Sequence, residues 1–465
     1  MRALLEHMLK TSDLDSPGLS PEEYAENFSD LHPPLDAHQA AVEADRCYFC
    51  HDAPCVTACP TGIDIPSFIQ KIATGNLRGS AKKILDENIF GAMCARVCPT
   101  EVLCEEACVR NTGENKPVAI GLLQRFSTDH LLAGGVQIYN QGPDSGKRIA
   151  IVGAGPAGLS CAHRLSMLGH SVTVFEAREK CGGLNEYGIA AYKVTGGIAQ
   201  REIDYVLGVG GIEIKPAQTS GRDFSLAGLR ENYDAVFLAM GLGGINQLGL
   251  QGEDMDNVLS AVDYIAELRQ TDDLASLPIG QRVVVVGGGM TAIDIACQSR
   301  RLGAGDVTLV YRRGAEEMGA SAFECDLART DGVKIIYWAA PVRILSEEGA
   351  LQAVEFEKTR ANGAGGAGSP TGTGEKFIIE ADMLFKAIGQ AFESTSLEGF
   401  AESPELSKGR IVVDAAGRTS LDGVWAGGDC VAGGQDLTVA AVQDGKVAAH
   451  SIDSYLRGEA GENNG

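Results

Sequence analysis

Eight of the thirteen cysteines lie in two blocks between positions 47 and 108. The blocks read Cys47-x2-Cys50-x4-Cys55-x3-Cys59-Pro60 and Cys94-x3-Cys98-Pro99-x5-Cys104-x3-Cys108. Grouped thiolates with Cys-Pro endings are typical of iron–sulfur proteins, in which four cysteines hold one cluster. The two blocks therefore predict two [4Fe–4S] clusters.

The order of these cysteines indicates how two clusters would share them. In ferredoxin-like runs the fourth cysteine, which precedes proline, binds the other cluster. Cys47, Cys50 and Cys55 would then begin one cluster, and Cys59 would belong to the second. Cys104 and Cys108 are four residues apart, so we expect them on one face of a helix.

A glycine-rich turn follows the cysteine blocks, in the stretch KRIAIVGAGPAGLSCAHRLSMLGHSVTVFEA, which predicts strand, turn, helix and strand. The turn consists of Gly153, Gly155, Pro156, Ala157 and Gly158, with Ala154 between the first two glycines. Glycines allow the backbone to approach a pyrophosphate at the helix N-terminus. Glu176 follows Gly153 by 23 residues, where an acid is expected to bind a ribose. This stretch predicts a dinucleotide site.

A second copy of the pattern occurs in QRVVVVGGGMTAIDIACQSRRLGAGDVTLVYRR. Its turn has the GxGxxA form and comprises Gly287, Gly289, Met290, Thr291 and Ala292. The second strand of this copy ends in Arg312 and Arg313 instead of an acid. Arginines at this place pair with a 2′-phosphate, which favours NADP(H) over NAD(H). A solvated basic pair is the alternative interpretation.

The segments between these motifs indicate the elements that position them. The stretch PSFIQKIATGNLRGSAKKILDENIF predicts two amphipathic helices broken at Gly75 and Asn76, and VAIGLLQRFSTDHLL predicts another helix. Residues 141–147 form a turn-rich linker. The two strand–turn–helix units lie 134 residues apart, so they fit two separate domains. Residues 361–376 are rich in glycine and predict a long hairpin loop.

Later parts of the chain resemble flavoproteins with two dinucleotide-binding domains. The stretch GVWAGGD at 423–429 resembles their second FAD motif, and that resemblance implies FAD contacts for Gly428 and Asp429. The helix that follows, which includes Thr438, would point its N-terminus at the flavin and favour negative charge there. Gly241 and Gly389 end short strands that resemble the crossings between the two domains.

We therefore expect an α-helical N-terminal iron–sulfur domain followed by an α/β flavoprotein with two Rossmann-like dinucleotide-binding domains. A length of 465 residues is consistent with about three domains. The expected boundaries are 1–146 for the helical domain, 147–250 with 382–465 for the discontinuous FAD domain, and 251–381 for the NAD(P) domain.

Composition excludes several classes of function. The chain carries 39 Lys and Arg against 62 Asp and Glu, a net charge of −23, which disfavours binding to nucleic acid and anionic membranes. No apolar run reaches the roughly 18 residues that span a bilayer, and the first residues do not form a signal peptide. We expect a cytoplasmic protein, in which grouped cysteines favour metal binding over disulfides.

The five other cysteines form no Cys-x-x-Cys or Cys-x4-Cys pair of the kind used in thioredoxin-reductase chemistry. They are expected to be small core residues. These cysteines are Cys161, Cys181, Cys297, Cys325 and Cys430.

The segments CHDAPCVTACP, GAMCARVCPTEVLC and IGLLQRF resemble the N-terminal half of dihydropyrimidine dehydrogenase, and above all its separate bacterial flavin/iron–sulfur subunit. The glutamate synthase small subunit is a close relative of that family. The resemblance implies one cluster on Cys47, Cys50, Cys55 and Cys108, and a second on Cys59, Cys98, Cys104 and Gln124. Cys94 would then bind no iron. An ordinary polar helix residue is the alternative interpretation of Gln124.

One stretch departs from the family pattern beside the expected flavin. Family members often read YGIPxxRL, whereas this chain reads YGIAAYKV within GGLNEYGIAAYKV, which also contains Gly183. Lys193 keeps the positive charge of the family's arginine without its planar fork, and it is the residue we assign to the catalytic site. Hydride transfer needs no general acid or base, so none is assigned.

The resemblance implies an oxidoreductase subunit that takes hydride from NAD(P)H onto FAD and passes single electrons through two clusters. The sequence shows no eight-fold series of strands and helices, so we expect an FMN-containing barrel subunit to hold the site for uracil or thymine. Two alternatives stay open: a glutamate synthase small subunit or a paralogue with another acceptor, and a non-catalytic iron–sulfur scaffold.

Overall fold

A computed structural model of the protein describes residues 18–362, 369–393, 397 and 403–458. It divides into two compact units. The first contains the described residues up to Leu31, then Tyr187–Tyr192 and Ile245–Gly389, and the second contains His32–Glu186, Lys193–Gly244 and the described residues from Gln390 onward. None of the helices within these described ranges has the length and apolar character needed to cross a membrane.

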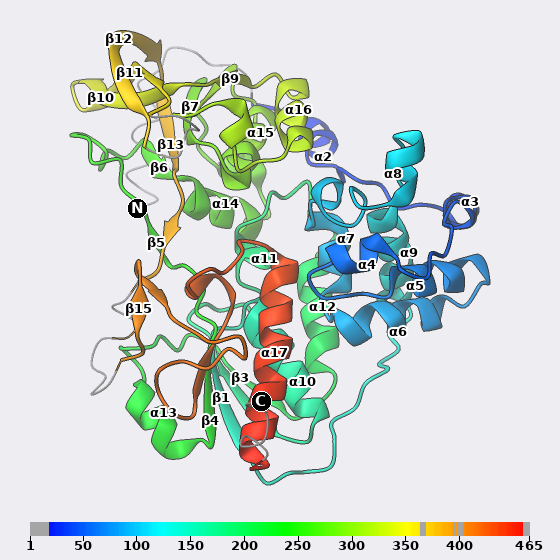
Figure 1. The fold of residues 1–465 in the computed structure, drawn as a ribbon. Coiled ribbons are helices and arrows are strands. Elements are labelled where there is room, and N and C mark those ends of the chain that lie inside the picture. The colour runs from blue at the N-terminus through cyan, green and yellow to red at the C-terminus, as the bar shows by residue number, and fades with distance from the viewer. Residues whose placement is uncertain (1–17, 363–368, 394–396, 398–402, 459–465) are drawn as a thin grey trace. The chain divides into compact units, whose positions relative to one another are not determined.

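The second unit begins with a group of helices that carry both cysteine blocks (Figure 1). Asn76 caps one of them by accepting a hydrogen bond from Gly79 N at 2.9 Å, and Gly75 adopts a φ of +74°, which confirms the predicted break. Apolar side chains from several of these helices form one buried cluster around Phe68, Ile84 and Leu123. The helices are α3 (Ala37–Asp45), α4 (Pro54–Ala58), α5 (Ile65–Ala73), α6 (Leu77–Glu87), α7 (Gly91–Val97), α8 (Val109–Glu114) and α9 (Ile120–Ala133).

The second unit also contains a five-stranded parallel sheet, with strand order β17-β4-β1-β2-β3. Its strands are β1 (Arg148–Val152), β2 (Ser171–Phe175), β3 (Ile212–Lys215), β4 (Ala235–Leu238) and β17 (Val424–Ala426). The helices are α10 (Pro156–Met167), α12 (Ile198–Leu207), α13 (Leu226–Asn232) and α17 (Thr438–Leu456). Because β17 comes from the end of the chain and pairs with β4, this sheet is discontinuous in sequence.

Helix α17 lies beside α10 (Figure 1). A Cβ on Gly445 of α17 would overlap the carbonyl oxygen of Ala157 in α10, so the two helices approach closely only because this position is glycine. The Ser160 hydroxyl donates to Val442 O at 2.8 Å at the same contact. The helix that follows the GVWAGGD motif is thereby held against the first glycine-rich turn.

The first unit contains another five-stranded parallel sheet, with strand order β6-β13-β7-β8-β9. Its strands are β6 (Val258–Ser260), β7 (Arg282–Gly287), β8 (Asp306–Val310), β9 (Lys334–Ile336) and β13 (Met383–Ala387). Its helices are α2 (Pro21–Asn27), α14 (Ala261–Gln270), α15 (Met290–Arg301) and α16 (Ala322–Thr330). A three-stranded antiparallel sheet of β10 (Ala339–Glu347), β11 (Ala350–Arg360) and β12 (Thr371–Glu380) completes the unit.

Two sequence predictions about local structure are wrong. Strand β12 begins at Thr371, so the predicted loop at 361–376 is shorter, with residues 363–368 outside the described residues. Backbone pairing with β11 does not require apolar side chains, which explains how this polar stretch forms a strand. Cys104 lies in a turn, and Cys108 is extended just before α8, because the short 3₁₀ turn Thr100–Val102 is not continued into a helix.

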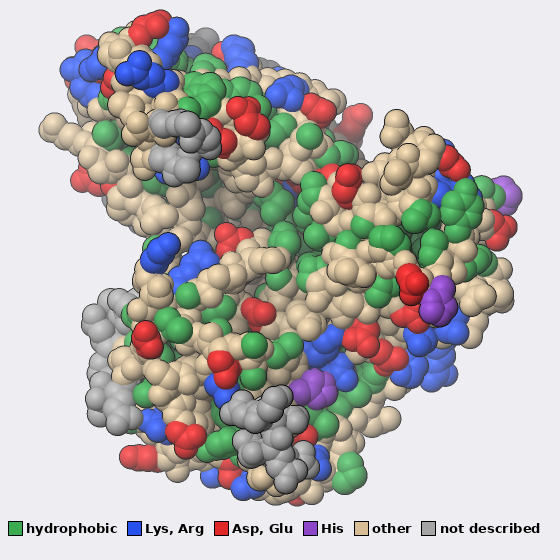
Figure 2. Space-filling view, viewed as in Figure 1, with side chains coloured by type: hydrophobic (Ala, Val, Ile, Leu, Met, Phe, Trp, Pro, Cys, Tyr) green, Lys and Arg blue, Asp and Glu red, His purple; other side chains and the backbone are tan. Residues whose placement is uncertain are grey.

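The two units differ from the expected three domains, since the described residues up to Leu31 and Tyr187–Tyr192 belong to the unit that contains Ile245–Gly389. The cysteine-bearing helices and the sheet of β1 belong to one compact unit, whereas 1–146 was expected to form a domain of its own. Acidic and basic side chains are interspersed on the face of the protein seen in Figure 2.

Candidate redox site

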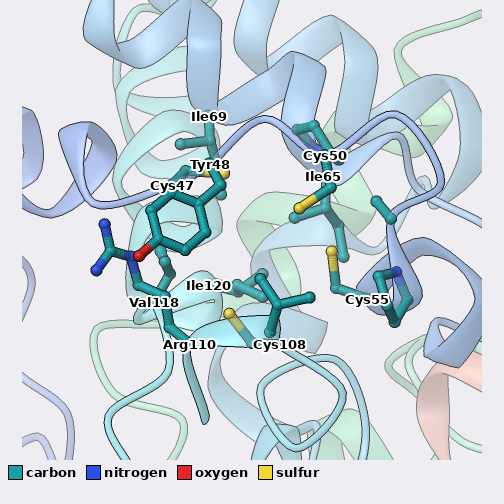
Figure 3. Close-up of a pocket in the computed structure, with 14 residues that line it drawn as sticks. Cys47, Tyr48, Cys50, Cys55, Ile65, Ile69, Cys108, Arg110, Val118 and Ile120 are labelled. Carbon is teal, nitrogen blue, oxygen red and sulfur yellow. The ribbon is translucent and has the colours of Figure 1, made fainter. Parts of the chain in front are cut away.

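Four cysteines from separate segments line one hollow in the second unit. They are Cys47, Cys50, Cys55 and Cys108, which we call the first cysteine set. Figure 3 shows the sulfur atoms of Cys50, Cys55 and Cys108 around the space between them. Part of the hollow is open to solvent. The structure thus brings together the four residues expected to share one cluster.

Apolar side chains from the helices, among them Ile65, Ile69 and Ile120, line the same hollow. Burial, together with the neighbouring Cys108 and Cys47 thiols, raises the pKa of the Cys55 thiol to about 12. The Cys55 sulfur would therefore stay protonated at neutral pH unless positive charge compensated its thiolate form. Iron supplies such charge, so this donor set fits a metal cluster.

The cysteines do not form a site for a single ion. Among the described residues, no group of three or more His, Cys, Asp or Glu side chains is arranged to hold one metal ion. A four-iron cluster is larger than an ion, so its thiolates are spread around it with space between them. The hollow within the first cysteine set matches that expectation.

A second group of thiols lies on the neighbouring segments. Contacts with Cys94, burial, and proximity to Cys104 and Cys59 hold the pKa of Cys98 well above its usual range. Burial, Glu105 and Cys59 do the same for Cys104. Cys59, Cys98 and Cys104 therefore lie near one another and, with Gln124, are called the second cysteine set.

Gln124 in α9 is held by a hydrogen bond to the start of α7. Its amide nitrogen donates to Gly91 O at 2.7 Å, and the residue is buried. A carbonyl oxygen only accepts hydrogen bonds, so the amide nitrogen must face Gly91 and the amide oxygen must lie on the other side. The amide oxygen is therefore the atom of Gln124 that could bind iron. That it does so is a proposal.

The first glycine-rich turn has the geometry of a dinucleotide site. A Cβ on Gly158 would overlap Gly153 O, and Gly153 has a φ of +104°. A Cβ added to Gly155 would have Gly183 Cα as its nearest neighbour, at 3.9 Å. The turn is therefore open on that side. Pro156 begins α10, whose N-terminal N–H groups favour an anion.

Glu176 stabilises this turn through hydrogen bonds. Its carboxylate accepts hydrogen bonds from Ala154 N and Arg178 N, each at 2.8 Å, and the residue is 8% exposed. A carboxylate has further acceptor positions, so these bonds leave Glu176 able to bind a ribose hydroxyl as expected.

The second FAD motif lies against the first turn. A Cβ on Gly428 would meet Ala157 Cβ at 3.1 Å, and Gly428 N donates to the Asp444 carboxylate at 2.9 Å. Burial, together with the nearby Asp436, raises the pKa of the next residue, Asp429, to about 6. Thr438, the first residue of α17, donates its hydroxyl to the Asn185 side chain at 2.7 Å.

The residues expected at the edges of this site are placed as follows. Gly241 follows β4 with a φ of +62°, and Gly389 follows β13 with a φ of +92°. Lys193 is 7% exposed and belongs to the second unit. Its catalytic role remains a proposal.

The second glycine-rich turn lies in the first unit. A Cβ on Gly287 would overlap Ala387 O, while in front of Gly289 no atom lies within 4 Å. Met290 begins α15, with Thr291 next, and Ala292 is fully buried. Arg312 is exposed and Arg313 is half-buried after β8. The open turn fits a nucleotide pyrophosphate, and the exposed arginine fits a phosphate on its ribose.

Sequence reasoning missed two features near these sites. Tyr311 lies against Gly288, and its hydroxyl donates to Glu317 O at 2.7 Å beside the second turn. Glu202 of α12 accepts hydrogen bonds from Ala92 N at 2.6 Å and Met93 N at 3.0 Å in α7. No local pattern marks Glu202, because its partners lie 110 and 109 positions away.

The Glu202 carboxyl is buried where the cysteine-bearing helices meet the sheet of β1. Burial raises its pKa from 4.5 to about 8, against the opposing effects of the two N–H donors and of Arg96.

The other five cysteines are buried, which confirms the prediction that they are core residues.

Comparison with known proteins identifies relatives over most of the chain. Residues 24–136 match the family described as dihydropyrimidine dehydrogenase domain II, 4Fe-4S cluster. Residues 147–445 match pyridine nucleotide-disulphide oxidoreductase. The dihydropyrimidine dehydrogenase subunit PreT of Escherichia coli K12, named as NAD-dependent, is 36% identical over 93% of this chain and 98% of its own. The glutamate synthase [NADPH] small chain of the same organism is 35% identical over 92% and 94%.

Solved structures share the fold. FprA of Mycobacterium tuberculosis, in a structure with NADPH, has a TM-score of 0.57 at 17% identity and covers 70% of this chain and 87% of its own. Thioredoxin reductase of T. acidophilum has a TM-score of 0.53 at 22% identity and covers 67% and 99%. The expected fold class is confirmed. The chain belongs to the pyridine nucleotide-disulphide oxidoreductase family and, with its N-terminal 4Fe-4S domain, to the NAD(P)H-dependent flavin/iron–sulfur subunits that include PreT and the glutamate synthase small chain.

Proposed function

We propose that this chain is the electron-input subunit of a dihydropyrimidine dehydrogenase, with two [4Fe–4S] clusters, FAD and a preference for NADPH. The observation that carries the proposal is the presence of both cysteine sets and the FAD-type turn in one compact unit. FAD, when bound, supplies the conversion between two-electron hydride chemistry and single-electron transfer. A cytoplasmic location belongs to the same proposal.

The residues of the second unit would hold the flavin in the following way. The turn from Gly153 to Gly158 and the N-terminus of α10 would bind the pyrophosphate, and Glu176 would bind the ribose. Asp429 and Thr438 would contact the flavin half, and Lys193 would place a positive charge beside it. Deep burial around Gly428 would exclude water from this part of the site.

In the first unit, Gly287 to Ala292 would bind the nicotinamide nucleotide, and Arg312 and Arg313 would contact its 2′-phosphate. NADPH is therefore the proposed donor. PreT is named as NAD-dependent, so the preference for NADPH rests on the two arginines and not on that relative.

An FMN-containing barrel subunit is the proposed partner, which makes the working enzyme a hetero-oligomer. The described strands of this chain form open sheets and not a barrel, so a pyrimidine site of that kind has no place among them. Glutamate synthase is the second candidate, because its small chain is 35% identical to this protein, close to the 36% of PreT. Membership of an oxidoreductase family removes the support for a non-catalytic scaffold.

Partner-dependent turnover distinguishes the two candidates. The purified chain would be mixed anaerobically with NADPH and either an FMN-barrel subunit with uracil or a glutamate synthase large subunit with glutamine and 2-oxoglutarate. Loss of uracil in the first mixture alone supports the proposal. Formation of glutamate in the second mixture alone would instead identify the chain as a glutamate synthase small subunit.

A further inference from the structure

Lys446 connects helix α17 to the segments that carry the cysteines. Its ammonium group donates to Thr61 O at 3.0 Å, to Glu87 O at 3.2 Å and to the Glu87 carboxylate at 2.6 Å. Only 13% of the Lys446 side chain is exposed, whereas the Glu87 side chain is 44% exposed. A buried ammonium with three acceptors is held in one position.

Thr61 continues this connection to a sulfur atom of the second cysteine set. Its hydroxyl oxygen lies 3.3 Å from Cys59 Sγ, and the residue is 3% exposed. A cysteine that binds iron is a thiolate and has no proton to donate. In a cluster-bound chain the Thr61 hydroxyl must therefore be the donor and Cys59 Sγ the acceptor.

We propose that Lys446 is a positioning residue that sets the reduction potential of the cluster bound through Cys59. It fixes Thr61 so that the hydroxyl donates to the ligand sulfur, and it adds one positive charge near the cluster. The inference rests on the proposed function through the assignment of Cys59 as a ligand. Hydrogen bonds to cluster sulfurs and nearby charge are two of the factors that set cluster potentials.

Both contributions act in the same direction. Reduction adds negative charge to the cluster, so a hydrogen-bond donor and a cation each favour the reduced form and raise its potential. Glu87 opposes Lys446, because its carboxylate lies 2.6 Å from the ammonium group. The Glu87 carboxylate is more exposed and therefore better screened by water, so Lys446 should have the larger effect.

The opposite charges of Lys446 and Glu87 distinguish this proposal from a purely structural role, because only the proposal predicts opposite shifts in cluster potential. Cluster potentials would be measured in the full chain by mediated potentiometry followed by electron paramagnetic resonance, after iron content has been determined. Lys446→Met and Thr61→Val should each lower the potential of one cluster, with a reduction constant three- to tenfold smaller. A tenfold change is about 59 mV for one electron. Glu87→Gln should raise the same potential.

Matched controls keep the result interpretable. Thr61→Ser retains the hydroxyl and should leave the potential unchanged, as should Lys147→Met, which removes an exposed lysine paired with Asp234 at 3.1 Å. If Lys446→Met loses the cluster, Thr61→Val and Glu87→Gln still decide the outcome. Unchanged potentials in both of these variants, with full iron content, would overturn the inference.

A separate variant tests the assignment beneath this inference. Cys59→Ser should lower the iron content or change the resonance of one cluster. If both clusters persist unaltered in Cys59→Ser, the ligand assignment in the proposed function fails, and the potentials of the Lys446 and Thr61 variants no longer report on that ligand.

Discussion

At the scale of single residues, the second cysteine set already supplies the four ligands that a cluster needs. Cys94 lies beside this set and is a further possible ligand. Cys94 is 2% exposed and contacts Cys98, while Gln124 is fixed by its bond to Gly91. We predict that Cys94→Ser retains eight irons per chain, as assayed chemically, because Gln124 and not Cys94 completes the cluster. Gln124→Leu should lose up to four irons. The reverse pattern would make Cys94 the ligand.

Arg312 is the residue on which nucleotide preference should depend. It is exposed after β8, where a 2′-phosphate would lie. Replacement by alanine should raise the KM for NADPH tenfold or more, equivalent to about 1.4 kcal/mol, and leave the KM for NADH within about twofold. Arg329→Ala removes an arginine of the same unit that pairs with Asp326, and should change neither value. Equal effects on both nucleotides would contradict the assignment.

At the scale of elements, the contact of α17 with α10 depends on a glycine. Gly445→Ala would place a methyl group on Ala157 O and should destabilise the protein by about 1–3 kcal/mol or more, with loss of bound flavin. Denaturant unfolding and flavin content measure both effects. Gly113→Ala, in α8 with no atom within 4 Å of the new methyl, should be neutral or stabilising by up to about 1 kcal/mol. Equal stability of the two variants would contradict this account.

Sequence patterns predicted the elements that depend on local chemistry. The Gly75–Asn76 break and both glycine-rich turns follow from propensity and spacing, whereas the long final helix was expected from the resemblance to flavoproteins. The spacing of Cys104 and Cys108 was misleading, because four residues also fit a turn followed by an extended residue. The contact of Lys446 with Thr61 joins positions 385 residues apart, and no local pattern encodes it.

At the scale of the whole molecule, Glu202 joins the cysteine-bearing helices to the sheet of β1, and its pKa is raised to about 8. A carboxyl with a raised pKa contributes stability that is complete below about pH 4.5 and is lost as the pH rises through 8. Between pH 7 and 9 the free energy of unfolding should therefore fall by roughly 1 kcal/mol more in the native protein than in Glu202→Gln.

Urea denaturation of both proteins across this pH range measures the difference. Glu213→Gln, on an exposed position of β3, is the control and should follow the native protein. Parallel pH profiles for the native protein and Glu202→Gln would show that the buried carboxyl does not titrate in this range.

Delivery of electrons from a nicotinamide nucleotide to the cysteine-bound clusters is the central claim. The most direct measurement adds NADPH anaerobically to the purified chain alone and follows flavin absorption together with the paramagnetic resonance of the clusters. The account predicts that the flavin band bleaches and that a reduced-cluster signal then appears. Bleaching with no cluster signal, or no bleaching with either NADPH or NADH, would contradict it.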